Sequence, residues 1–317
     1  MLDPRQHPGA LSLRRARPGE EDAVLIPCTQ PPPVPPGGCL ERWREAVEAR
    51  RAWLREGLTS DGLRVMVAWV PAPPDPFIDY PGVGPVATQT LASAGQIPAG
   101  LVEYAPVTSA AEPVRGEGAW VIHCVWVIPP YSRRGIGAEL VTEVLRDLRQ
   151  DPGRRGCTGV AVVAYEGESW WGFFDCMPAA FFSRLGFVPV DRDGRRVLMY
   201  RALDPQTPPP YLIPPRTEID TPQGPGSQEG SATAVRLVYH SRCPAAVLVK
   251  ETVEIEFAHR RDVHFDALDS RDRKILLRYG VANGLYVNGR LAMHKVPSAT
   301  EVVSAAGRKT SPHDPGR

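Results

Sequence analysis

The segment from 132 to 138 contains the residues whose types and spacing best suit the binding of an anion. It reads Ser-Arg-Arg-Gly-Ile-Gly-Ala and stands between a strand-like run over 120–128 and an amphipathic helix expected over 137–149. Backbone N–H groups at a helix start, with the positive end of the helix dipole, bind phosphate oxygens, and glycine lets a phosphate approach the backbone closely. The segment therefore predicts a site for the pyrophosphate of a nucleotide or of CoA.

Three other interpretations of this segment compete with a pyrophosphate site. Two glycines also occur in ordinary strand-to-helix turns, so Gly-x-Gly alone favours a turn without a ligand. A dinucleotide fingerprint requires a third glycine where Leu140 stands, and a P-loop requires Gly-Lys-Ser or Gly-Lys-Thr, which the sequence lacks. Both nucleotide fingerprints are therefore disfavoured.

A resemblance to a known family favours the CoA pyrophosphate. Residues 127–140 resemble the acetyl-CoA motif of GNAT acyltransferases, Gln/Arg-x-x-Gly-x-Gly/Ala, with Ser132 in place of Gln or Arg. Residues 179–188, which contain Leu-Gly-Phe, resemble a helix and turn of the same family. The resemblance implies acetyl-CoA as co-substrate, paired with strand backbone, and direct transfer of its acetyl group to an amine of a small molecule or a protein. The residues that it implies for the cofactor are Val127, Ile128, Ser132, Arg133, Arg134, Gly135, Ile136, Gly137 and Ala138.

Three side chains are candidates for the transfer itself, which requires a neutral amine and a donor for the developing oxyanion. His123 is the candidate base because its ordinary pKa lies near neutrality, and a core histidine satisfied by a neighbouring carbonyl is the alternative. Glu103 would orient the amine, or it would be a solvated strand residue. Cys176 would be a thiolate partner, or buried apolar filling. Phe182 stands where the family often has a tyrosine acid.

The elements that must position these residues follow from the apolar pattern. Strict alternation along 120–128 places His123 on one face with Val125 and Val127. The predicted fold class is α/β, with a mixed, mostly antiparallel sheet flanked by helices as in GNAT proteins. The expected strands are 63–70, 100–107, 120–128, 158–165 and 196–201, and the expected helices are 40–58, 137–149 and 178–185.

A second, small α/β domain is expected after a segment rich in proline and glycine. A strand over 234–240 leads to Cys243 and a helix over 245–256, and a later hairpin turns at Asn288-Gly289. This order resembles a thioredoxin-like domain, and the pair of domains resembles the YoaP-like N-acetyltransferases. Cys243 is a candidate accessory thiol, but Ala246 stands where a resolving cysteine would be, which favours a monothiol or structural role. The predicted division is a disordered tail over 1–10, an acyltransferase domain over 11–203, a linker over 204–231, a thioredoxin-like domain over 232–304 and a disordered tail over 305–317.

Composition limits the partners and the location of the chain. Its 37 basic and 36 acidic side chains give a net charge of +1, without the positive field that a nucleic-acid surface requires. No apolar stretch has the length needed to span a membrane, and residues 1–10 lack the core of a signal peptide. Six cysteines without a Cys-x-x-Cys pair predict reduced thiols. We therefore expect a cytoplasmic protein with no nucleic-acid, membrane or metal partner.

The sequence is also compatible with two functions of other classes. Phe182 and the solitary Cys243 are also compatible with a catalytically decayed CoA-binding protein or a thiol-based redox-sensing regulator. A structural scaffold that joins two domains predicts no CoA binding at all.

Overall fold

The computed structural model describes residues 11–29, 40–60, 62–72, 95–150, 156–167, 177–220 and 232–307. The chain divides into two compact units, Met1–Ile213 and Pro214–Arg317. Each unit has its own sheet and its own apolar core.

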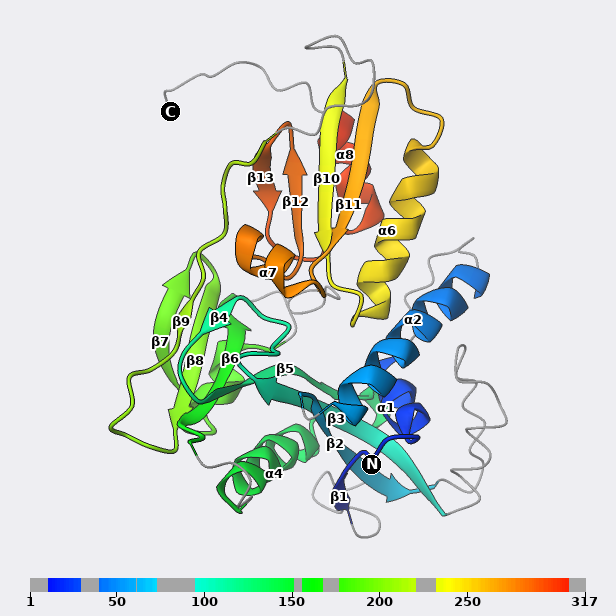
Figure 1. Cartoon of the computed structure of the whole chain (residues 1–317). Coiled ribbons are helices and arrows are strands. Elements are labelled where there is room, and N and C mark those ends of the chain that lie inside the picture. Colours follow the sequence, from blue (N-terminus) through cyan, green and yellow to red (C-terminus); the bar gives the residue numbers. More distant parts are fainter. Residues whose placement is uncertain are drawn as a thin grey trace. The chain divides into compact units, whose positions relative to one another are not determined.

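Seven strands form the large sheet of the first unit (Figure 1). Every neighbouring pair is antiparallel except β5 and β6, which run parallel. The predicted mixed, mostly antiparallel sheet is therefore confirmed. In order across the sheet, the strands are β1 (Ser12–Arg15), β2 (Arg64–Pro71), β3 (Gln96–Pro106), β5 (Ala119–Val127), β6 (Gly159–Tyr165), β8 (Arg196–Ala202) and β7 (Val188–Asp193).

Helices cover both faces of this sheet (Figure 1). On β3, Glu103 forms an ion pair with Arg50 of one helix, whereas the hydroxyl of Tyr104 donates a 2.7 Å hydrogen bond to Asp147 of another. Because successive strand residues point to opposite faces, these two helices lie on opposite sides of the sheet. The helical elements are α1 (Glu21–Cys28) and α2 (Leu40–Thr59) on the Glu103 side, α4 (Ile136–Gln150) and α5 (Ala179–Ser183) on the Tyr104 side, and the 3-10 turn η1 (Pro129–Tyr131) after β5.

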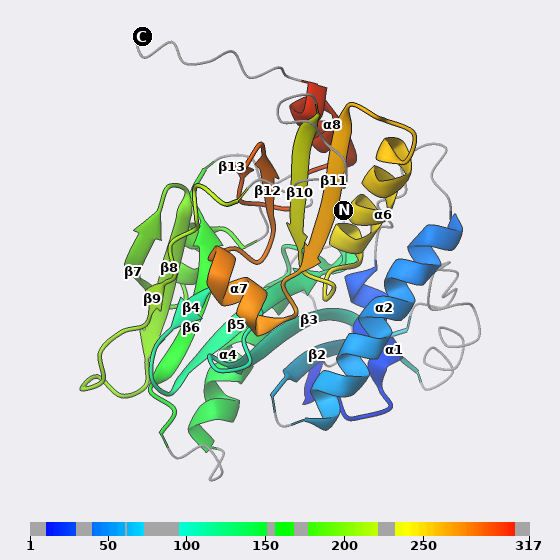
Figure 2. The ribbon, with the colours of Figure 1, turned by 45° about the horizontal axis from the view of Figure 1, so that its top comes forward.

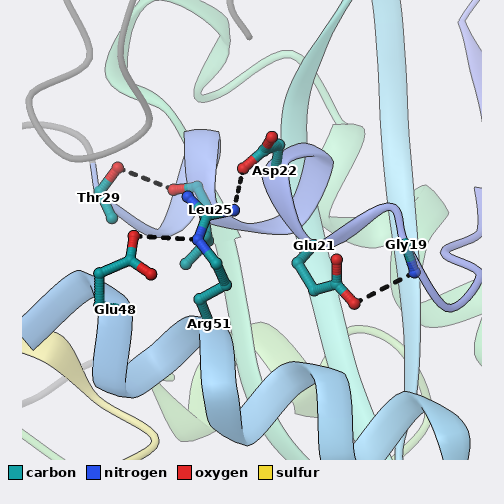
Figure 3. A network of polar contacts seen from close by, with 7 residues as sticks. All are labelled: Gly19, Glu21, Asp22, Leu25, Thr29, Glu48 and Arg51. Atoms are coloured by element: carbon teal, nitrogen blue, oxygen red, sulfur yellow. Dashed lines mark hydrogen bonds and ion pairs between the residues drawn. The ribbon is translucent and has the colours of Figure 1, made fainter.

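The helix α4 has the apolar stripe that the sequence predicts. Its buried side chains recur at helical spacing and pack against β2, β3, β5 and β6, so burial of this stripe holds α4 on the sheet. A polar contact also joins the helices α1 and α2: Arg51 of α2 contacts Asp22 of α1. Within α2, Arg51 donates from Nε to Glu48 at 3.1 Å (Figure 3). The buried residues of α4 are Ile136, Leu140, Val141, Val144, Leu145 and Leu148.

A β-bulge in β5 corrects the predicted alternation. Glu103 lies opposite Cys124 and Tyr104 lies opposite Ile122, so His123 is an extra residue in β5. The bulge reverses the phase of the strand beyond it. Val125 and Val127 consequently pack with the core under α4, and the prediction that they share a face with His123 is wrong.

The second unit has a four-stranded sheet in the order β11-β10-β12-β13 (Figure 2). The strands β10 and β11 are parallel, and the other neighbouring pairs are antiparallel. One apolar core lies between the sheet and the helices α6 and α8, and a second lies under α7. The elements are β10 (Thr233–Tyr239), α6 (Pro244–Phe257), β11 (Val263–Asp269), α7 (Arg273–Tyr279), β12 (Gly284–Val287), β13 (Arg290–Met293) and α8 (Ala299–Gly307).

The described part of the expected linker over 204–231 is divided between the two units. The short strand β9 (Tyr211–Leu212) pairs with β4 (Val114–Arg115) in the first unit. Beyond the boundary, the N–H of Arg216 donates to the carbonyl of Tyr279 at 2.9 Å in the second unit. The helix α8 buries Ala305 and Ala306, so the second unit extends past 304. Residues 1–10, 221–231 and 308–317 lie outside the described residues.

Candidate functional site

The sheet of the first unit splits between its two parallel strands. The ladder joins Ala119 to Gly159 at its start and Ile122 to Val162 at its end, while β5 continues to Val127. Among the described residues, no strand pair joins the remainder of β5 to β6. The side chains from Cys124 to Val127 are only half-buried, as expected beside an opening.

The chain after β6 turns into this split. Tyr165 pairs with Arg196 of β8 on one side, so its bridge to Pro178 must lie on the side that faces β5. The N–H of Tyr165 also donates to the carbonyl of Met177 at 3.1 Å. These bonds place α5 at the end of the split, opposite the start of α4.

The glycine segment lies directly beyond β5, as the sequence predicted. After η1, Arg133 has a φ of 61° and Gly135 a φ of 84°, and both angles are in the left-handed region. A Cβ at Gly135 would meet nothing within 4 Å, so the space in front of this glycine is open. Within the described residues, the N–H groups of 133–136 donate no hydrogen bond to the main chain. They are available at the start of α4, where an anion is favoured.

The first turn of α4 brings the two GNAT-like motifs together. A Cβ at Gly137 would lie 3.5 Å from Cζ of Phe181 in α5 and 3.9 Å from Cγ1 of Val125 in β5. The Leu-Gly-Phe turn that follows α5 depends on Gly186, whose φ is 79°. Residues distant in the sequence therefore line one end of the split.

Phe182 does not face this end of the split. Its side chain is fully buried and packs edge-on against Phe187, with ring centroids 5.5 Å apart. Phe181, its half-buried neighbour, is the residue beside Gly137. A phenol with no role predicted from the sequence, that of Tyr131 in η1, is half-buried near Arg134, whose Cζ lies 5.5 Å from the ring centroid. Burial raises the pKa of Tyr131, and Arg134 partly offsets this shift.

His123 is held by a backbone contact on the face away from α4. Its Nε2 accepts a hydrogen bond from the N–H of Ala111 at 3.2 Å, and its side chain is buried. An imidazole nitrogen that accepts a hydrogen bond carries no proton, and its lone pair is occupied by the donor. The geometry therefore favours the core-histidine interpretation, with a backbone N–H as the partner in place of a carbonyl.

Glu103 is not the solvated residue that the alternative interpretation expected. Its side chain is 2% exposed, and it forms an ion pair with Arg50, whose side chain is 1% exposed. The guanidinium of Arg50 also lies over the ring of Trp53, 4.7 Å from the centroid. Because α2 covers this part of β3, a residue that the sequence pattern would place in solvent is enclosed. The sequence contains one signal for this pair. Arg50 falls on the apolar stripe of the helix expected over 40–58, at helical spacing from Val47 and Leu54.

The remaining candidates lie elsewhere. Cys176 is outside the described residues. Cys243 belongs to the second unit, where it is half-buried and is the N-cap residue of α6, with Pro244 as the first helical residue. Its carbonyl accepts from the N–H groups of Ala246 and Val247.

Within the described ranges, no group of three or more His, Cys, Asp or Glu residues is arranged to hold a metal ion. The described helices include none that is long and apolar enough to cross a membrane.

Comparisons with known proteins give a family match within the first unit. Residues 48–174 match the model of the Acetyltransferase (GNAT) family. The comparison with curated proteins gives no match. Solved structures similar to this chain include a putative GNAT acetyltransferase from Desulfovibrio desulfuricans, with 16% identity, a TM-score of 0.37, and coverage of 61% of this chain and 99% of the other.

Two further structures are similar over most of the same length. A GNAT acetyltransferase from Brucella melitensis in complex with acetyl-CoA has 19% identity and a TM-score of 0.31, with 64% of this chain and 93% of the other covered. NAA60 from Arabidopsis thaliana in complex with acetyl-CoA has 13% identity and a TM-score of 0.38, with 61% and 99% covered. The family match spans the split strands, the glycine segment and α4, and the first unit of this chain therefore carries an acetyltransferase domain of the GNAT family.

Proposed function

We propose that the first unit binds acetyl-CoA and transfers its acetyl group directly to an amine of a small molecule or a protein. The observation that carries this proposal is the parallel ladder that ends at Ile122 and Val162, with the glycine segment beyond the same end of β5. An open strand edge that leads to the start of a helix suits a ligand with a chain of amides and a pyrophosphate. The match of residues 48–174 to the GNAT family supports it.

The residues fit such a ligand at two places. Backbone N–H groups from Arg133 to Ile136 would hold the pyrophosphate, since the position in front of Gly135 is open and the start of α4 favours an anion. The edge of β5 beyond Ile122, to which no described strand is paired, would pair with the pantetheine amides as far as Val127. The backbone of Ile128, predicted to share this role, is instead bonded to Ala99 and Tyr131. Bound acetyl-CoA supplies a thioester whose carbonyl the amine attacks.

The contribution of this chain to the transfer is mainly positioning. Glu103 has a buried counter-ion, and the Nε2 of His123 is occupied by the N–H of Ala111. Neither group can take a proton from an amine without losing a buried partner, which costs free energy. We therefore propose that the acceptor enters as the neutral amine. His123 and Glu103 then have a structural role, in which they fix the positions of β5 and β3.

Calorimetry on a pair of glycine variants tests the proposal. Gly135→Glu should weaken acetyl-CoA binding about 100-fold, because a carboxylate repels the pyrophosphate and fills the space in front of the N–H groups. Gly194→Glu is the matched control, since Gly194 also has a positive φ of 56° and open space around its Cβ position, but lies in the turn between β7 and β8. Equal acetyl-CoA affinity in the two variants would overturn the assignment of the pyrophosphate site.

A turnover assay separates the transferase from its alternative. Release of CoA thiol in the presence of amines is expected for the wild type. A catalytically decayed CoA-binding protein or thiol-based regulator would bind acetyl-CoA in calorimetry and release no thiol with any amine tested.

For the second unit we propose a thioredoxin-like fold and a relationship to the YoaP-like proteins. The strand order β11-β10-β12-β13 supports this, as does the position of Cys243 at the start of the helix after the central strand β10. Ala246 follows one turn later, so a dithiol cycle is not available at this position. Cys243 is a free thiol, which suits the proposed cytoplasmic location.

A further inference from the structure

A pocket lined by arginines lies in the first unit, apart from the split in the sheet. It has a volume of about 440 Å³, within the range of small-molecule sites, and is formed by the end of β1, the turn before α1, the end of α2 and the start of β2. Its lining includes the apolar side chains of Leu58 and Leu63. Four arginines also line it: Arg14, Arg15, Arg17 and Arg64.

The charge of this pocket is predominantly positive. Two carboxylates contact its arginines: Glu20 lies 2.8 Å from Arg14, and Asp147 lies 2.6 Å from Arg64 and 3.3 Å from Arg15. Arg17 is exposed, and its guanidinium has no acidic partner within the described residues. A concave surface with an excess of one charge concentrates counter-ions.

Two of the arginines are held in place by aromatic rings. The guanidinium of Arg64 lies 5.2 Å from the ring centroid of Trp120, and its side chain is only 13% exposed. The guanidinium of Arg14 lies over the ring of Trp69 at 4.2 Å. Ordering these side chains in advance lowers the entropy cost of binding a ligand.

Carboxylates also fix the turn that carries Arg17. The backbone N–H of Arg17 donates to Glu20 at 2.9 Å. The N–H of Gly19 donates to the buried Glu21 at 3.1 Å, and Figure 3 shows this carboxylate turned back toward the glycine. The turn is therefore a defined wall of the pocket.

The pocket and the glycine segment lie at opposite ends of α4. Arg15 and Arg64 bind Asp147 in the last turns of the helix, whereas the glycine segment precedes Ile136. At 1.5 Å per residue, these two positions are about 16 Å apart along the axis. One ligand pyrophosphate cannot occupy both.

We propose that this pocket binds a small anion that carries two or more negative charges on phosphate or carboxylate groups. Guanidinium groups recognise both kinds of oxyanion through paired hydrogen bonds. The concave form and the limited volume favour a small molecule, with an anionic group at the exposed Arg17 and its apolar part near Leu58 and Leu63. This site is separate from the acetyl-CoA site and does not depend on the proposed function.

Titration calorimetry on the full chain at low salt tests this site, with inorganic pyrophosphate in one arm and citrate in the other. The experiment is done in the Gly135→Glu variant, so that binding at the glycine segment does not contribute. Binding of either anion is expected, and Arg17→Glu should weaken it at least about tenfold, because an attractive charge becomes a repulsive one. Tighter binding of pyrophosphate identifies a phosphate ligand, and tighter binding of citrate a carboxylate ligand.

Arg192→Glu is the control for the change in net charge. Arg192 lies in β7 at the opposite edge of the sheet from β1, where it pairs with the exposed Glu166. Arg192→Glu, added to the Gly135→Glu variant, should leave the affinity for either anion within about twofold of that of Gly135→Glu alone, because exposed charges this far apart are screened. Absence of binding by both anions, or equal affinities in the Arg17→Glu and Arg192→Glu variants, would overturn the proposal. Neither result bears on acetyl-CoA binding, which the Gly135 and Gly194 variants test.

Discussion

Ile122 of β5 and Val162 of β6 form the last pair of the parallel ladder in the first unit. The next residue of β5 is His123, the bulged residue, so the ladder ends where the strand changes phase. Bulges bend strands and end pairing next to functional sites. The opening of the sheet and the change in which side chains face α4 thus have one local cause.

Substitution by alanine should change the free energy of unfolding in opposite directions at Gly137 and Gly135. Gly137 is helical and its Cβ position has ordinary contacts with Phe181 and Val125, so Gly137→Ala should raise the free energy of unfolding by up to about 1 kcal/mol. Gly135 has a φ of 84°, so Gly135→Ala should lower it by about 1 kcal/mol. Urea denaturation of both variants measures the difference. A gain in stability at both positions would contradict the conformation of Gly135.

Replacement of His123 distinguishes a base from a structural residue. The Oε1 of glutamine can accept the N–H of Ala111 in place of Nε2, so His123→Gln should keep turnover within about threefold, whereas His123→Ala leaves the buried N–H unpaired and costs about 1–3 kcal/mol of stability. Turnover and thermal unfolding of both variants are compared. A loss of 100-fold or more in His123→Gln, with its stability retained, is the result expected of a general base.

Removal of one partner of the buried ion pair between Arg50 and Glu103 should strongly lower the free energy of unfolding. Arg50→Ala leaves Glu103 enclosed without a counter-charge, and a loss of about 3–5 kcal/mol is expected. The double variant Arg50→Met with Glu103→Leu should lose much less, because neither charge remains. Arg192→Ala, which breaks the exposed pair with Glu166, is the control and should leave the free energy of unfolding nearly unchanged, because water screens exposed charges. Equal losses for Arg50→Ala and Arg192→Ala in urea denaturation would refute the burial of the pair.

The second unit should lose stability in alkaline solution through Tyr239. Burial, followed by the charges of Asp269, Glu254 and Glu251, raises the pKa of this phenol from 10.0 to about 12. The unfolded chain releases the proton first, so the contribution of Tyr239 is fully present below pH 10 and is lost as the pH rises toward 12.

Tyr239→Phe should remove that part of the alkaline loss of stability. Absorbance at the wavelength of phenolate, recorded from pH 9 to 13 on folded protein, measures the ionisation directly. The variant is expected to lack one late-titrating phenol. Loss of a phenol that titrates near pH 10 would instead show that Tyr239 ionises with the exposed tyrosines.

Much of the site could be predicted from residues that are close together in the sequence. The strand over 120–128, the glycines at 135 and 137 and the helix that follows appear in the structure as β5, the open segment and α4. These features depend on local backbone preferences and on apolar spacing, both of which can be read within one or two turns. The βαβ-type order and the hairpin at Asn288-Gly289 in the second unit were predictable for the same reason.

Other features were decided by contacts between distant segments. The enclosure of Glu103 requires Arg50 of α2, the occupied Nε2 of His123 requires the backbone of Ala111, and the arginine pocket requires both β1 and the end of α2. A one-residue bulge also exchanged the faces of β5, and period-two alternation cannot reveal an extra residue. The sequence by itself thus determined the glycine segment and the order of elements, because these are local. Only the tertiary structure decided which side chains reach the split and which are buried in ion pairs, because burial and register depend on what the rest of the chain places opposite them.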